Sequence, residues 1–105
     1  MSINKHGGGE VYSVSVPAAG AMIVERNVLI KYIRISNVSD VPVFVALNTP
    51  ADGKCPAAVN SGIFLNGKDY VNSFVEFNIS NIPICQIWGI VSGQSAATVS
   101  VQLGQ

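Results

Sequence analysis

The chain has 105 residues and a net charge of zero, and only 11% of its residues are charged, against the ~25% usual in soluble domains. This length is that of one domain around a single hydrophobic core. Zero net charge argues against a nucleic-acid-binding protein, which needs a basic stripe to displace counterions. It also removes the self-repulsion that keeps proteins apart, so association with other proteins is expected.

Neither a membrane protein nor a secreted protein is indicated. The apolar runs are interrupted by Ser, Asn, Pro and Gly, and none approaches the ~18 apolar residues of a membrane-spanning helix. The segment 1–10 is polar and contains no apolar stretch of the kind that a signal peptide requires. We therefore expect a protein that is made in the cytoplasm and has no membrane partner.

In chain order, residues 1–10 form a glycine-rich segment that predicts a flexible arm, followed by one domain over residues 11–105. From residue 11 onward, apolar residues recur with a period of two, which is typical of strands. The expected strands are residues 11–16, 21–24, 28–36, 41–47, 63–65, 70–77, 84–91 and 96–103.

Two of these segments and one loop suggest how the chain is arranged. The segment 28–36 carries apolar residues on both faces, which favours a central strand. Its cations Lys31 and Arg34 are then expected at strand ends or at a subunit boundary. The segment 48–61 is the longest irregular stretch, and a loop of that length in a small domain is usually functional or interfacial.

Two hairpins are predicted. Asn66 and Gly67 follow the strand at 63–65, and an Asn-Gly pair is a strong signal for a two-residue turn. The last two strands, 84–91 and 96–103, are expected to pair with each other across a polar turn, with alternate apolar residues facing inward.

The predicted fold is all-β. No segment shows an apolar stripe of helical period, and the strands are rich in Val and Ile, which favour extended structure. Seven or eight short strands, separated by turns at intervals of roughly 8–12 residues, predict a single antiparallel β-sandwich. Its topology is expected to be either a jelly roll or immunoglobulin-like.

The ionisable side chains form no catalytic or metal-binding pattern. His6, the single histidine, lies in the predicted arm, without the fixed position that a general base requires. Cys55 and Cys85 lack the spacing of zinc ligands, and two free thiols are favoured over a disulfide between them. No charged residue and no histidine occurs from Phe77 to Gln105. We expect a protein that is not an enzyme and binds no metal or cofactor.

Trp88 leaves two interpretations open. Carbohydrate-binding modules expose aromatic rings for stacking on sugars, and an exposed Trp88 or Tyr70 would fit such a module. Trp88 lies between apolar neighbours on a predicted strand, however. Packing in the core or at a subunit interface is therefore favoured, because a large ring buries much surface.

Three segments together carry a resemblance to a protein family. Residues 32–46 are two strands around a Ser/Asn/Asp turn, residues 62–67 a short strand with Asn-Gly, and residues 87–101 two strands around a Ser-Gly turn. This layout resembles the small β-sandwich proteins of tailed-bacteriophage virions, including capsid auxiliary (decoration) and tail-associated proteins. The resemblance implies a structural protein of the virion without catalytic residues. It further implies a homo-oligomer, a trimer or another ring, that docks on the major capsid protein or another virion protein.

The contacts of such a protein are expected in the segment 1–16 and in the loop 48–61, which are least able to bury themselves within one domain. Lys31 and Arg34 are expected to pair with acidic residues of a neighbouring subunit. The residues predicted to lie at protein interfaces are Val11, Tyr12, Val14, Lys31, Arg34, Pro50, Asp52, Lys54 and Trp88. A carbohydrate- or receptor-binding module of a fibre is the alternative function.

Overall fold

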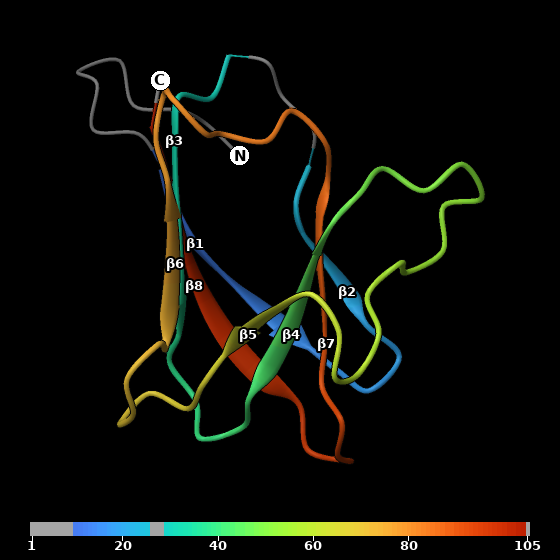
Figure 1. Ribbon diagram of the computed structural model, residues 1–105. Coiled ribbons are helices and arrows are strands. Elements are labelled where there is room, and N and C mark those ends of the chain that lie inside the picture. The colour runs from blue at the N-terminus through green and yellow to red at the C-terminus, as the bar shows by residue number, and fades with distance from the viewer. Residues whose placement is uncertain (1–9, 26–28, 105) are drawn as a thin grey trace.

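The computed structural model describes residues 10–25 and 29–104, and these form two four-stranded antiparallel sheets without a helix (Figure 1). The all-β sandwich predicted from the sequence is therefore confirmed. The strands are β1 (Glu10–Val16), β2 (Ala21–Val24), β3 (Tyr32–Asn37), β4 (Val43–Leu47), β5 (Ile63–Leu65), β6 (Phe74–Phe77), β7 (Ile87–Ile90) and β8 (Ala97–Gly104). Residues 1–9 of the predicted arm, His6 among them, and residues 26–28 lie outside the described residues.

The strand order identifies the topology. Sheet A has the order β1-β8-β3-β6 and sheet B the order β2-β7-β4-β5, so β1 and β2, β3 and β4, and β7 and β8 are consecutive strands in opposite sheets. Among the described strands, β4 and β5 alone are neighbours both along the chain and within a sheet. This arrangement of eight strands is that of a jelly roll.

The two predicted hairpins are wrong. β5 pairs with β4 and β6 pairs with β3, so the connection after Leu65 crosses from sheet B to sheet A. Neither Asn66 nor Gly67 has the positive φ that a primed two-residue turn requires. Gly67 instead permits a close approach, because a Cβ there would lie 3.0 Å from the carbonyl oxygen of Asp40. β7 and β8 likewise lie in opposite sheets.

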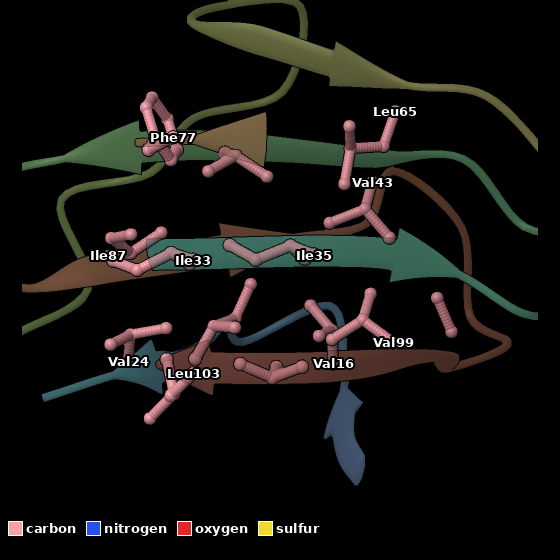
Figure 2. Close-up of a cluster of buried hydrophobic side chains, with 14 of the residues drawn as sticks. Val16, Val24, Ile33, Ile35, Val43, Leu65, Phe77, Ile87, Val99 and Leu103 are labelled. Atoms are coloured by element: carbon pink, nitrogen blue, oxygen red, sulfur yellow. The ribbon is translucent and has the colours of Figure 1, made fainter. Parts of the chain in front are cut away.

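The core lies between the sheets and is built by alternate residues of the strands. Figure 2 shows these side chains pointing toward one another from both sheets. The labelled members are Val16, Val24, Ile33, Ile35, Val43, Leu65, Phe77, Ile87, Val99 and Leu103. Burying each such apolar side chain stabilises the fold by roughly 1.5–3 kcal/mol. β3 is a central strand as predicted, since β8 and β6 flank it.

Gly89 explains how β7 approaches the core so closely. A Cβ at this position would lie 2.7 Å from Cδ1 of Ile23 and 3.1 Å from Cγ1 of Val43. Gly89 also faces Cys55, whose Sγ lies 3.9 Å from the Gly89 carbonyl oxygen. Both Cys55 and Cys85 are free, partly buried thiols, as favoured from the sequence. The loop 48–61 that holds Cys55 extends away from the sandwich next to β4 (yellow-green in Figure 1).

Candidate protein interface

Sheet B contains no polar side chain. Its strands have the sequences AMIV, VFVAL, IFL and IWGI, so every residue is apolar or glycine. A sheet with one face in water normally alternates apolar and polar residues, whereas continuous apolar strands are typical of sheets that are covered on both faces. One face of sheet B packs on the core, and the other face is equally apolar, a composition suited to contact with another apolar surface.

The residues of this outer face follow from the register of the strands. Val43, Val45, Leu65 and Ile87 point into the core, so the residues that alternate with them point outward. We call these outward residues the apolar face: Met22, Phe44, Ala46, Phe64, Trp88 and Ile90. Met22 and Phe64 are exposed, Ala46, Trp88 and Ile90 are half-buried, and Phe44 is buried. The strand pairing places Met22, Trp88 and Ala46 in one row, and Ile90, Phe44 and Phe64 in a second row.

The aromatic rings of the apolar face have defined contacts within the chain. The ring centroids of Phe44 and Phe64 lie 5.4 Å apart with an interplanar angle of 48°, which is a favourable tilted geometry. The indole Nε1–H of Trp88 donates a hydrogen bond of 3.0 Å to Oε1 of Gln86, the residue that precedes β7. Because this donor already has a partner, the indole ring can lie against an apolar surface without leaving a buried donor unpaired.

The outer face of sheet A has the opposite character. Its outward side chains on β1, β8 and β3 are mostly hydroxyl and amide groups: Ser13, Ser15, Ser36, Thr98, Ser100 and Gln102. This polar composition is that of a sheet face in contact with water. The two outer faces of the sandwich therefore differ in chemistry, and only the face on sheet B lacks groups that water can hydrogen-bond.

An ion pair reinforces the polar face of sheet A. Nη1 of Arg34 lies 3.3 Å from Oε2 of Glu76 on the neighbouring strand, and the guanidinium carbon lies 4.2 Å from the ring centroid of Phe74. The hydroxyl of Tyr32 donates a hydrogen bond of 2.6 Å to the same carboxylate, and this bond raises the pKa of Tyr32. Arg34, which was expected to pair with a neighbouring subunit, thus has an acidic partner in its own chain.

One end of the sandwich presents an exposed apolar pair on a braced loop. Tyr70 is 66% exposed and Val71 is 80% exposed, in the connection between β5 and β6. The buried side chain of Asn37 holds this end together, because its Nδ2 donates hydrogen bonds to the carbonyl oxygens of Val41 (2.7 Å) and Asn66 (3.0 Å). These bonds tie the β3–β4 connection to the β5–β6 connection.

The structure does not bring the residues predicted at interfaces together into one site. Arg34 lies on the outer face of sheet A and Trp88 on that of sheet B, so the two are on opposite faces of the sandwich. Lys31 is exposed ahead of β3. Val11 is exposed on β1, at the edge of sheet A.

The other predicted interface residues fall into two further groups. Tyr12 and Val14 are half-buried on the inner face of β1, where they pack against the core. Asp52 and Lys54 are exposed at the tip of the loop 48–61, with Pro50 half-buried beside them. The backbone N–H of Lys54 donates a 3.0 Å hydrogen bond to Oδ1 of Asp52, which makes this tip a compact turn.

Sequence reasoning found Trp88 but missed most of the apolar face. Met22, Phe44, Phe64 and Ile90 come from four different strands and meet only through the pairing of those strands. The available signal was the absence of any polar residue from each of the four segments. For one strand this absence indicates burial, and for a whole sheet it indicates an apolar outer face.

Among the described residues there is neither a group of metal ligands nor a membrane-spanning helix. Over residues 10–25 and 29–104, no three His, Cys, Asp or Glu side chains lie close enough to hold a metal ion. The same residues contain no helix with the length and hydrophobicity needed to cross a membrane. Comparison with protein-family models, with curated proteins and with solved structures found no match.

Proposed function

We propose that this protein is a non-enzymatic structural subunit of a bacteriophage virion, an auxiliary or decoration protein that binds the capsid lattice as a symmetric oligomer. The observation that carries the proposal is the apolar face, since a complete sheet without polar side chains is suited to docking on another protein. Jelly rolls also occur in viral capsid proteins, and this likeness is an analogy at the level of the fold.

Physical chemistry supports docking on a repeating surface. A contact through the apolar face would depend on burial of apolar area and hardly on ion pairs, so its affinity should change little with salt. A small contact area per subunit suffices when a symmetric oligomer engages several equivalent sites, because each further contact is effectively intramolecular. A capsid or tail lattice supplies such equivalent sites.

The first experiment asks whether the chain is part of the particle. Purified virions of the phage that encodes it are analysed by quantitative mass spectrometry, with the major capsid protein as the reference. We expect the chain in a fixed ratio to that protein, retained after washing with concentrated salt. Particles that lack the chain would refute the proposed function.

The second experiment tests the surface. Phe64 and Phe74 are both 46% exposed and both lie on edge strands, but Phe64 belongs to sheet B and Phe74 to sheet A. We expect Phe64→Lys to weaken binding to particles that lack the protein by at least ~10-fold, because a charge would be buried in the contact. Phe74→Lys is the matched control and should bind as the wild type does. Equal losses in both variants would contradict docking through sheet B.

A specific observation favours one alternative, a carbohydrate- or receptor-binding module. Tyr70 is exposed on a loop that Asn37 holds at Asn66, and an exposed aromatic ring is suited to stacking on a sugar. Jelly rolls also occur in lectins. A glycan array with Tyr70→Ala and Trp88→Ala variants tests this alternative. Binding that Tyr70→Ala abolishes would support it, and an array without binding would remove it.

A further inference from the structure

Three of the four sheet edges are protected against pairing with another chain. β2 has four residues with an irregular register between Met22 and Val24, and β5 has three residues. β6 has four residues and carries Glu76, which pairs with Arg34 beside it. Short strands, bulges and charges are the features by which natural sheets prevent edge-to-edge association.

The fourth edge, β1, is long and regular, and its one charged residue, Glu10, is buried at its first position. It has seven residues, and its register with β8 is continuous from Glu10 to Val16. No proline and no charged residue occurs between Val11 and Val16. In an antiparallel edge strand, about half of the residues direct their N–H and C=O groups away from the sheet. Among the residues that the structure describes, the backbone of β1 pairs with β8 alone.

The inner side chains of β1 are also incompletely covered. Tyr12, Val14 and Val16 point toward the core, but only Val16 is fully buried, while Tyr12 and Val14 are half-buried. β1 and β2 are the edge strands on the same side of the sandwich. The hydroxyl of Tyr12 donates a hydrogen bond of 2.7 Å to the carbonyl oxygen of Ile23 on β2. The half-buried side chains therefore mark an open side of the core.

We propose that the β1 edge is the self-association site of this protein, where a second copy pairs antiparallel about a two-fold axis at Ser13. The pairing joins two A sheets into one continuous sheet. It places Tyr12 of each copy opposite Val14 of the other, and Val11 opposite Ser15, so no two charges oppose each other. This inference rests on the proposed function, which includes a symmetric oligomer, and specifies that oligomer as a two-fold dimer.

A second copy is the occupant that fits best, because the edge is complementary to itself. Seven paired residues span about 24 Å, and an antiparallel pair of identical strands satisfies the outward backbone groups of both copies. We expect a contact through one short strand per copy to bury less than the ~800 Å² per partner of a standard stable interface. We therefore expect a reversible dimer with a dissociation constant in the micromolar range.

Sedimentation equilibrium of the full chain tests the proposal with two variants that carry opposite charges at position 13, measured alone and mixed. Ser13 is exposed and lies opposite itself in the proposed pairing, so Ser13→Lys and Ser13→Glu each place like charges together. Each variant alone should dimerise at least ~10-fold more weakly than wild type. An equimolar mixture of the two should recover the wild-type mass, twice 11.0 kDa. The control Thr98→Lys adds a charge on β8, one strand in from the edge, and should dimerise normally.

Several results would overturn the proposal. These are a wild type that stays monomeric at high micromolar concentration, a dimer that Ser13→Lys leaves intact, and a mixture that fails to recover the wild-type mass. Circular dichroism of each variant establishes that the fold is retained. The outcome is separable from the test of particle binding, because Phe64→Lys changes sheet B and should leave the dimer intact. A dimer of a chain that is absent from virions would refute the proposed function alone.

Discussion

Asn37→Ala should destabilise the domain far more than Asn78→Ala, although both asparagines begin the same Asn-x-Ser turn. Oδ1 of Asn37 accepts hydrogen bonds from the N–H (3.0 Å) and the hydroxyl (2.7 Å) of Ser39. Oδ1 of Asn78 accepts the equivalent bonds from Ser80, at 3.1 Å and 2.7 Å. The local turn is therefore the same at the two asparagines. The difference between the two variants in free energy of unfolding then measures the effect of burying Asn37 and its additional hydrogen bonds.

Burial sets the magnitude. Asn37 is 2% exposed, and its Nδ2 donates to two carbonyl oxygens, those of Val41 and Asn66. Removing the side chain leaves the Asn66 oxygen without this donor and the Val41 oxygen with only the longer bond of 3.4 Å from the hydroxyl of Ser39. A buried group that loses its hydrogen bond costs about 1–3 kcal/mol. We expect Asn37→Ala to cost about 3 kcal/mol, a large part of the ~5–15 kcal/mol that stabilises a typical domain. Asn78 is exposed, and water replaces its bonds, so Asn78→Ala should cost less than ~1 kcal/mol.

Urea denaturation of the two variants measures the difference, with thermal melting as a second readout. A loss of about 3 kcal/mol should lower the melting temperature by on the order of 15 °C in a domain of this size. Asn37→Asp keeps the shape and the bonds to Ser39 but loses both donated bonds, so it should be at least as destabilising at neutral pH. Free energies of unfolding that agree within ~0.5 kcal/mol for Asn37→Ala and Asn78→Ala would refute the reasoning, because the difference expected from burial is several-fold larger.

Three further predictions concern single positions. Gly89→Ala should cost about 1–3 kcal/mol by overpacking, since its Cβ would lie 2.7 Å from Cδ1 of Ile23, and a wild-type melting temperature would contradict this. Gly62→Ala should cost more than Gly53→Ala, because both have positive φ but a Cβ at Gly62 alone would overlap a β4 carbonyl oxygen; equal urea midpoints would contradict it. Burial, and secondarily the charge of Glu10, raises the pKa of Tyr12 from 10.0 to about 12, so the neutral phenol is favoured in the folded state. The contribution of neutral Tyr12 to the free energy of unfolding is complete below pH 10 and is lost as the pH rises to about 12. Tyr12→Phe should remove this part of the pH dependence of stability, measured by urea unfolding, and an unchanged pH profile would contradict the prediction.

The sequence predicted the class of fold because alternation reports directly which side chains face a core. It could not predict the pairing of strands, because a strand that crosses to the opposite sheet shows the same alternation as one that returns in a hairpin. The connection at Asn66 and Gly67 is an example. The Asn-Gly pair is a real turn signal, but its physical use here is the close approach of Gly67 to Asp40 and a backbone bond from Asn66 to Asn72 (2.9 Å).

The candidate interface was predictable only in part, for a related reason. Val11, Tyr12 and Val14 lie next to each other in the sequence and on one edge of the structure, so local reasoning was enough to select them. The apolar face is not local, because Phe44 and Phe64 come from strands separated by the loop 48–61. Its existence depends on which strands share a sheet, and that information is not carried by any single segment.

The two proposed contacts have a joint consequence for how the protein would bind a particle. Residues directly opposite each other in an antiparallel pair share a face, so the two cores and both B sheets of the dimer lie on the same side of the joined A sheet. Both apolar faces are then directed toward that side, turned relative to each other by the twist of the sheet. Both copies of the dimer can therefore dock at once only on a lattice whose neighbouring binding sites are turned relative to each other by the same angle.

This geometry separates the effect of pairing from the effect of the docking contact. Ser13→Lys leaves each apolar face intact and removes only the link between the two faces, so it should weaken particle binding by at least ~10-fold through lost multivalency. Phe64→Lys should weaken binding within each copy, with the dimer mass unchanged. Thr98→Lys should preserve both properties, and titration of particles with fluorescently labelled protein measures all three variants. If Ser13→Lys bound particles as tightly as wild type, each copy would dock alone, and the β1 pairing would have no part in particle binding.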